Sequence, residues 1–176
     1  AAFNHLEQAG KVRHFGVSNQ NPMMMELLKT AVKQPLKVNQ LQLSAAFTPS
    51  FEAGFHVNME GLKAAVRDGS VFEYCRLNDT VIQAWSVLQH GYFKGNFVGK
   101  EEFAALNHVL IDLAKKYQVT PTAIALAWVL RYPGKMQAVI GTTKPQHVLE
   151  AGKAAEVTLT RKEWYQIYLA AGNDLP

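Results

Sequence analysis

The chain has 176 residues, of which 48% are hydrophobic and 18% are charged, and its formal net charge is +4. This length and composition suffice for a globular domain with a hydrophobic core and argue against intrinsic disorder. No apolar run approaches the roughly 20 residues of a transmembrane helix, and the first residues lack the basic and apolar segments of a secretory signal. We therefore expect one domain over residues 1–176, no membrane contact and a cytoplasmic location.

The basic and metal-binding residue types exclude several kinds of site. Lys and Arg are spread along the chain without a basic run, which does not support nucleic-acid binding. Cys75 is the only cysteine, and no histidine or asparagine is visibly placed to activate it as a nucleophile. The six histidines follow none of the zinc-motif spacings, so we predict no metal site. The positive surplus is compatible with a small phosphorylated ligand.

Helices and strands alternate in the first part of the chain. Gly10 suits the left-handed position after a helix, and Asn21-Pro22 has the residue types of a helix N-cap and first helical residue. The apolar spacing predicts an inner helix face made by Met24, Leu27, Leu28 and Ala31. The expected order is helix 1–9, strand 12–17, helix 22–33, strand 36–43, loop 47–54 and helix 59–68.

The same alternation continues to the end of the chain. Thr120-Pro121 and Thr160 are helix start signals, and Pro133-Gly134 ends a helix. The loop after the third strand contains Gly91 and either covers a ligand or is a plain surface connection. The expected order is strand 80–85, a loop to residue 100, helix 101–117, helix 121–131, strand 136–140, a helix from 145 to about 155 and a helix 161–171.

This order predicts an α/β fold with a parallel sheet, because strands joined through helices pair in parallel. Only four strands are visible, and a helix precedes the first of them. The chain is therefore either a small open α/β domain or a portion of a larger fold. In such folds ligands bind at the carboxyl ends of the strands, where Ser18 and Asn19 follow the first strand.

A second candidate site follows the fourth strand. The segment Gly141-Thr142-Thr143-Lys144 leads from a strand into a helix, and it combines free backbone N–H groups, two hydroxyls and an ammonium. This combination suits an anion. The alternative is an ordinary helix start with Thr143 as its N-cap. Neither a phosphate-binding Walker loop nor the glycine pattern of a Rossmann turn is present.

Several segments, in their order along the chain, resemble the carboxyl half of an aldo-keto reductase. They are Gly10 to Asn19, Val38-Asn39-Gln40, Trp85-Ser86-Val87-Leu88, Pro121 to Arg131 and Val139 to Lys144, and the likeness extends to Glu163-Trp164 and Asp174-Leu175-Pro176. The resemblance implies a (β/α)8 TIM barrel that uses NADPH without a Rossmann fold. By this likeness the chain supplies the second half of the barrel, with four strands and their flanking helices, and a longer parent protein supplies the rest.

The resemblance also implies a role for particular residues. Ser18, Asn19 and Gln40 match positions that hydrogen-bond the nicotinamide carboxamide, and Trp85 matches the aromatic residue that stacks on the nicotinamide ring. Ser86 and Leu88 match the segment that lines the pyrophosphate, with Gly91 in the loop beyond it. The matches to the segment at the adenosine 2′-phosphate are Gly141, Thr142, Thr143 and Lys144. The family usually has an Arg shortly into the next helix, where this chain has His147 and Val148. The preference for NADPH over NADH is therefore left open.

The family's catalytic Asp, Tyr, Lys and His belong to the amino half, so no catalytic residue is assigned to this chain. The implied activity of the parent is reduction of small aldehydes or ketones, and the segment alone is expected to be inactive. The alternative is a non-enzymatic nucleotide-binding or subunit-like module of the same fold. We expect a half barrel to self-associate as a homo-oligomer that rebuilds a barrel. The apolar strand residues expected to lie against the other half or its helices are Val12, Phe15, Val17, Ile82, Trp85, Val139 and Ile140.

Overall fold

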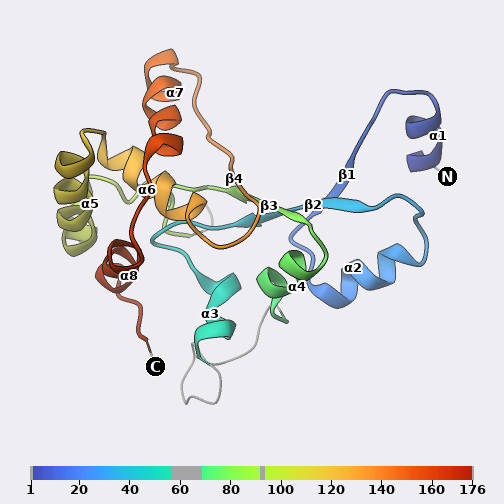
Figure 1. Ribbon diagram of the computed structural model, residues 1–176, viewed down its shortest axis with the longest axis horizontal. Coiled ribbons are helices and arrows are strands. Elements are labelled where there is room, and N and C mark those ends of the chain that lie inside the picture. The colour runs from blue at the N-terminus through green and yellow to red at the C-terminus, as the bar shows by residue number, and fades with distance from the viewer. Residues whose placement is uncertain (1, 57–68, 92–93, 176) are drawn as a thin grey trace.

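The computed structural model describes residues 2–56, 69–91 and 94–175. Helices and strands alternate along the chain (Figure 1). The elements are α1 (Ala2–Gln8), β1 (Phe15–Ser18), α2 (Pro22–Lys29), β2 (Leu36–Gln42), α3 (Pro49–Phe55), α4 (Val71–Leu77), β3 (Val81–Trp85), α5 (Ala104–Tyr117), α6 (Pro121–Leu130), β4 (Met136–Ala138), α7 (Pro145–Gly152) and α8 (Arg161–Ala170). Two short 3-10 helices, η2 (Glu101–Phe103) and η3 (Lys153–Glu156), precede α5 and follow α7.

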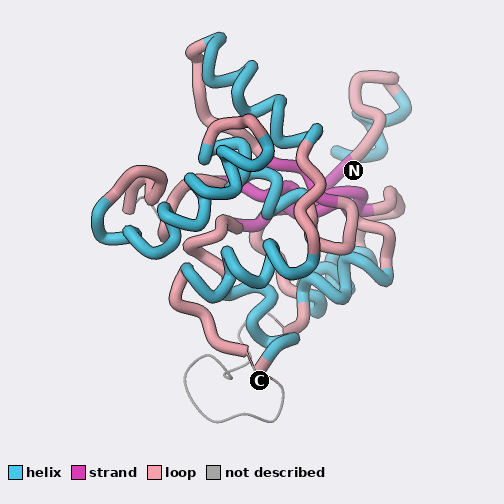
Figure 2. The backbone as a smooth tube through the Cα atoms, turned by 60° about the vertical axis from the view of Figure 1, so that its left-hand side comes forward, coloured by secondary structure: helices cyan, strands magenta, loops and turns pink. Residues whose placement is uncertain are grey.

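The strands form one parallel sheet in the order β1-β2-β3-β4, which confirms the predicted α/β fold. Figure 2 shows the strands together at the centre with the helices around them. In Figure 1, α2, α3 and α4 lie below the strands, whereas α5, α6, α7 and α8 occupy the left-hand side of the view. β1 and β2 approach closely at Gly16, where an added Cβ atom would lie 2.7 Å from the Cβ atom and the carbonyl oxygen of Val38. This position therefore requires glycine.

The two faces of the sheet differ in burial. On the face toward the helices, Leu41, Ile82 and Ala84 are buried in the core. On the other face Gln40, Gln83 and Trp85 are half-exposed. Parallel sheets are normally covered on both faces, so the described residues leave one face of this sheet open.

Two of the apolar residues expected to contact the other half of a barrel are instead covered by this chain. Phe15 is buried and stacks on Phe3 of α1, with ring centroids 4.3 Å apart. Ile82 is 1% exposed and belongs to the core. The expectation was wrong for both residues because strand side chains alternate, and these two point toward the helices.

The core is densest around α6, which packs against α5, α7, η3 and β4. Residues 123–129 of this helix are all buried, which is the pattern of a helix covered on every side. The indole rings of Trp128 and Trp164 stack with centroids 4.8 Å apart. Each indole N–H donates to the backbone carbonyl of the other residue at 3.0 Å. These paired contacts join α6 to α8.

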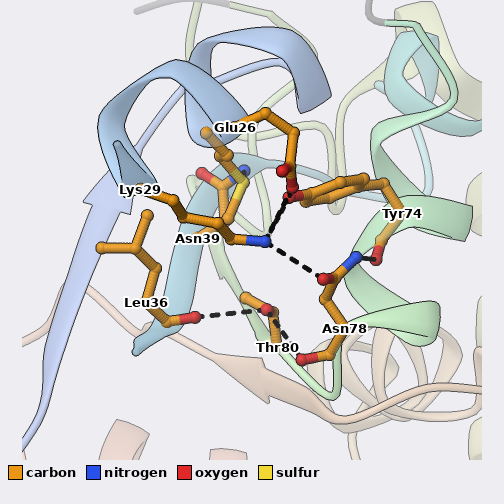
Figure 3. A network of polar contacts seen from close by, with 8 residues as sticks. Glu26, Lys29, Leu36, Asn39, Tyr74, Asn78 and Thr80 are labelled. Atoms are coloured by element: carbon orange, nitrogen blue, oxygen red, sulfur yellow. Dashed lines mark hydrogen bonds and ion pairs between the residues drawn. The ribbon is translucent and has the colours of Figure 1, made fainter. Parts of the chain in front are cut away.

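A polar network joins helix α2 to helix α4 (Figure 3). Lys29 Nζ donates to Glu26 Oε1 at 2.7 Å, to Tyr74 Oη at 2.6 Å and to Asn78 Oδ1 at 3.1 Å. The Tyr74 hydroxyl also donates to Glu26. Just after α4, Thr80 Oγ1 donates to the Leu36 carbonyl at 3.2 Å, which ties this end of α4 to β2.

Several predicted boundaries differ from the structure. The predicted loop 47–54 contains α3, and α4 was not predicted from the sequence. The predicted helix 59–68 lies outside the described residues. α2 ends at Lys29, before the predicted end at residue 33, and its buried residue is Met25, whereas Leu27 is 72% exposed. The predicted inner face of α2 was therefore wrong.

No helix within the described residues is long and apolar enough to cross a membrane.

The predicted cap at Thr160 is confirmed, and it forms part of a buried carboxylate site. The Thr160 hydroxyl accepts from the Glu163 backbone N–H, while the Glu163 carboxylate accepts from the backbone N–H of Thr160, forming a capping box. Glu163 also accepts from Lys116 Nζ at 2.6 Å and from the Tyr117 hydroxyl at 2.8 Å. Glu163 is 7% exposed. Burial by itself raises its pKa, but the hydrogen bonds from Lys116, Thr160 and Tyr117 outweigh burial and lower the pKa to about 2.

We predict that Glu163→Gln reduces the stability of the protein most above pH 5. A folded-state pKa below the unfolded value stabilises the fold above the unfolded pKa, and this contribution is lost as the pH falls from about 4.5 to about 2. The shift corresponds to about 3 kcal/mol. Thermal melts at pH 7 and pH 3 should show a large difference in Tm between wild type and variant at pH 7 and a smaller one at pH 3. Glu156→Gln, whose carboxylate is 66% exposed, is the matched control and should change Tm little at either pH. A Glu163→Gln effect that does not shrink at pH 3 would contradict the assignment.

We also predict that residues 1–176 expressed alone self-associate. β1 and β4 are the outer strands of the sheet, so among the described residues each has one edge without a partner strand, and these residues leave one face of the sheet uncovered. Size-exclusion chromatography with light scattering should show dimers or larger species. Val139 follows β4 and is 39% exposed, so Val139→Lys should shift the chain toward monomer. A soluble wild-type monomer with a cooperative thermal melt would support a small open α/β domain instead.

Candidate functional site at the carboxyl ends of the strands

The structure brings predicted residues from three neighbouring strands together. Asn19, directly after β1, has a left-handed backbone with φ of 52°, and its N–H donates to the Gln40 carbonyl at 3.0 Å. Ser18 Oγ donates to the same carbonyl at 3.2 Å. The indole N–H of Trp85, at the end of β3, donates to Asn19 Oδ1 at 3.4 Å. Ser18, Asn19, Gln40 and Trp85 therefore form one polar and aromatic cluster.

Asn39 fixes the turn that presents this cluster. Its side chain is fully buried, and its amide donates to the Gln20 carbonyl at 2.8 Å and accepts from the Gln20 N–H at 3.5 Å. One residue later, Asn21 caps α2 by accepting from the Met24 N–H at 2.9 Å. Sequence reasoning missed the role of Asn39. The available signal was a polar residue at a strand position that alternation assigns to the buried face.

A row of amide side chains leads away from the cluster across the open face. Gln40 pairs in register with Gln83, and Gln83 pairs with Gln137. Gln40 Nε2 donates to Gln83 Oε1 at 3.2 Å, and Gln83 Nε2 donates to Gln137 Oε1 at 2.9 Å. Gln40 was predicted as a site residue from the sequence, whereas Gln83 and Gln137, which are bonded in series to it, were not.

A cavity of about 400 Å³ lies beside the cluster. Asn19 and Trp85 contribute to its wall. The other lining residues are Gln20, Asn21, Met24, Leu41, Gln42, Phe47, Pro49, Ser50 and Val71. A second cavity, of about 360 Å³ and lined among others by Arg76, Arg131 and Arg161, contains none of the predicted site residues. Of these two cavities, the one at the strand ends is the one lined by predicted site residues.

The loop after β3 is held to the body of the chain. Ser86, with a left-handed φ of 51°, accepts from the Gln89 N–H at 2.9 Å, and the Leu88 carbonyl accepts from the Phe97 N–H at 3.0 Å. Asn107 of α5 is buried, and its amide bonds the Gly99 N–H and the Phe97 carbonyl at 2.8 and 2.9 Å. These contacts hold the described residues 97–99 against Leu88 and α5, and Gly91 is buried.

The segment from Gly141 to Lys144 follows β4 at the same edge of the sheet. Lys144 occupies the N-cap position of α7, and its side chain makes no capping bond. The alternative in which Thr143 caps this helix is therefore wrong. Thr142 Oγ1 accepts from the Lys144 N–H at 3.2 Å and lies 3.4 Å from His147 Nδ1. Among the residues that the structure describes, none forms an ion pair with Lys144, which is exposed together with Gly141 and Thr143.

Cys75 lies in the core and is unsuited to catalysis. It is fully buried in α4, and burial raises the pKa of its thiol to about 11, with a small opposing effect of Asn39. The thiol is therefore neutral near pH 7.

Within residues 2–56, 69–91 and 94–175, no group of three or more His, Cys, Asp or Glu side chains is arranged to hold a metal ion.

Comparison with known proteins identifies the family. The family model described as the aldo/keto reductase family matches residues 1–170. The chain belongs to the aldo/keto reductase family. This aldo-keto reductase chain is 32% identical to 6-dehydroglucose reductase of Agrobacterium fabrum, over 99% of the chain and 52% of that protein. It is also 32% identical to oxidoreductase YdhF of Escherichia coli, over 99% of the chain and 53% of that protein. The chain thus spans about half the length of these curated relatives.

Solved structures support the same fold. The chain superposes on an aldo-keto reductase from Klebsiella pneumoniae in complex with NADPH with a TM-score of 0.70 and 21% identity, over 94% of this chain and 50% of the other. The thermostable aldo-keto reductase Tm1743 in complex with epalrestat gives a TM-score of 0.69 and 22% identity, over 96% of this chain and 52% of the other. The four-stranded parallel sheet of this chain is consistent with part of an aldo-keto reductase TIM barrel.

Proposed function

We propose that residues 1–176 are the cofactor-binding carboxyl half of an NADPH-dependent aldo-keto reductase that reduces small aldehydes or ketones. The observation that carries the proposal is the cluster of Ser18, Asn19, Gln40 and Trp85 beside a cavity, at the same sheet edge as the Gly141–Lys144 segment. Membership of the family and the oxidoreductase names of the relatives support it.

The donor set fits a nicotinamide nucleotide. Ser18, Asn19 and Gln40 carry hydroxyl and amide groups, which offer the donors and acceptors that a carboxamide needs. Trp85 supplies an aromatic face for the nicotinamide ring, and Ser86, Leu88 and Gly91 are proposed to line the pyrophosphate.

The phosphate end of the cofactor fits the segment after β4. Lys144 has no carboxylate partner among the described residues, and it stands at the uncapped start of α7, an arrangement that suits an anion. We assign Gly141, Thr142, Thr143 and Lys144 to the 2′-phosphate of NADPH. His147, 3.4 Å from Thr142, stands near the place of the family's usual Arg, so Lys144 carries most of the proposed preference for NADPH.

NADPH, when bound, supplies the hydride that reduces a carbonyl carbon. In this proposal the present chain binds and orients the cofactor. The family's Asp, Tyr, Lys and His, of which Tyr is the proton donor, come from the other half of the parent, so residues 1–176 alone have no reductase activity. The alternative of a non-enzymatic nucleotide-binding or subunit-like module is distinguished by the parent sequence, which in that case lacks the Tyr and Lys pair.

We predict that the full-length parent oxidises NADPH in the presence of generic aldehydes or ketones and that residues 1–176 alone do not. Absorbance at the NADPH band measures both reactions, and a chelator should leave the rate unchanged because the proposed mechanism uses no metal. Absence of activity with every carbonyl tested, or loss of activity on chelation, would contradict the proposed reaction.

We predict that Lys144→Ala in the parent weakens NADPH binding more than NADH binding. A charge-assisted contact to the 2′-phosphate is worth on the order of 1.5 to 3 kcal/mol, which corresponds to a loss of roughly 10- to 150-fold in affinity. Titration of both nucleotides against wild type and variant measures this difference. Lys153→Ala, an exposed residue paired with Glu156, is the control and should alter neither affinity. Equal losses for both nucleotides in Lys144→Ala would show that Lys144 does not bind the phosphate.

A further inference from the structure

Packing alone does not explain why three glutamines, Gln40, Gln83 and Gln137, form a row of amides across the sheet. Gln40, Gln83 and Gln137 are direct partners in strand register, so their side chains project from the same face of the sheet. In TIM barrels this face is normally filled by branched aliphatic residues. Burying a glutamine on this face costs free energy unless its amide is hydrogen-bonded, and here each amide is hydrogen-bonded to the next.

The bonds in the row have a direction. Gln40 donates to Gln83, and Gln83 donates to Gln137, so the amides are connected head to tail. The Gln40 amide carries one donor group and one acceptor atom. With Gln40 Nε2 bonded to Gln83, Oε1 is the atom of this amide that has no hydrogen-bond partner among the described residues. Ser18 holds the backbone at the same point, because its hydroxyl donates to the Gln40 carbonyl at 3.2 Å.

We propose that Gln83 and Gln137 are positioning residues, which orient the Gln40 amide so that its oxygen accepts from the N–H group of the nicotinamide carboxamide. This inference rests on the proposed function of the Ser18, Asn19, Gln40 and Trp85 cluster. The direction of the row determines what Gln40 offers: the reverse direction would present N–H donors and would favour the carbonyl oxygen of the carboxamide instead. Gln83 and Gln137 thus act on the cofactor through Gln40.

The test compares two nucleotides in the full-length parent. One is NADP⁺, and the other is its 3-acetylpyridine analogue, in which a methyl group replaces the amide nitrogen and removes the donor. Wild type should bind NADP⁺ more tightly than the analogue by about three- to tenfold, the effect of one neutral hydrogen bond. In Gln83→Leu the Gln40 amide loses its anchor, and this ratio should fall to within about twofold of one.

Three further variants separate orientation from folding. Gln83→Glu still accepts from Gln40, so the wild-type ratio should be retained even if both affinities change. Gln137→Leu leaves the Gln40 bond intact but frees Gln83, so the ratio should fall by less than in Gln83→Leu. Gln166→Leu, an exposed glutamine of α8, is the matched control and should leave both affinities unchanged. A merely structural role would lower both affinities together and leave the ratio alone.

The outcomes distinguish this inference from the proposed function. Parent protein that binds NADP⁺ with no preference over the analogue, or a Gln83→Leu variant that keeps the wild-type ratio, overturns the positioning role while cofactor binding stands. Parent protein that binds neither nucleotide overturns the proposed function and this inference with it. If Gln83→Leu does not fold, the test uses the ratio of NADP⁺ affinity to analogue affinity in Gln83→Glu and Gln137→Leu. An equal ratio in these two variants overturns the inference.

Discussion

Alternation of side chains along four parallel strands is the constraint on which this structure depends. Successive residues point to opposite faces, so Leu41, Ile82 and Ala84 enter the core, while Gln40 and Gln83 share the other face. The register aligns equivalent positions of neighbouring strands. One face therefore becomes a continuous core against the helices, and the other becomes a polar surface whose row of amides ends at the candidate cofactor site.

The parallel direction of the strands explains why the site residues meet. The carboxyl ends of all strands lie at one edge, so the turn after β1, the end of β3 and the segment after β4 all lie at this edge although they are far apart in the sequence. Asn39 gives this edge a defined shape, because a buried amide bonded to both the N–H and the carbonyl of Gln20 holds the turn after Ser18 and Asn19. Asn107 likewise holds the described end of the loop after β3, because its buried amide accepts from the Gly99 N–H and donates to the Phe97 carbonyl.

The open face of the sheet is the main difference from a self-sufficient α/β domain. Such domains cover both faces of a parallel sheet, whereas the helices in the described part of this chain bury one face. The chain matches about half the length of its curated relatives, and family barrels close the sheet on itself. A polar row on the open face is consistent with the interior of such a barrel, where the amides would bond one another out of contact with bulk water.

Local signals in the sequence were enough to determine the helix caps at Asn21, Thr120 and Thr160, because each cap rests on residues close together in the chain. The parallel α/β class and the family resemblance followed from the order of such local segments along the chain. The errors arose where long-range packing overrides local pattern. The apolar face of α2 predicted Leu27 as buried, yet only Met25 reaches the sheet, and α4 carries no strong start signal of its own. The roles of Asn39 and Gln83 were also out of reach, because their partners lie 19 and 43 or more residues away and are brought into bonding distance only by strand register. Only the tertiary structure decides such contacts, since they depend on which residues face one another across the sheet.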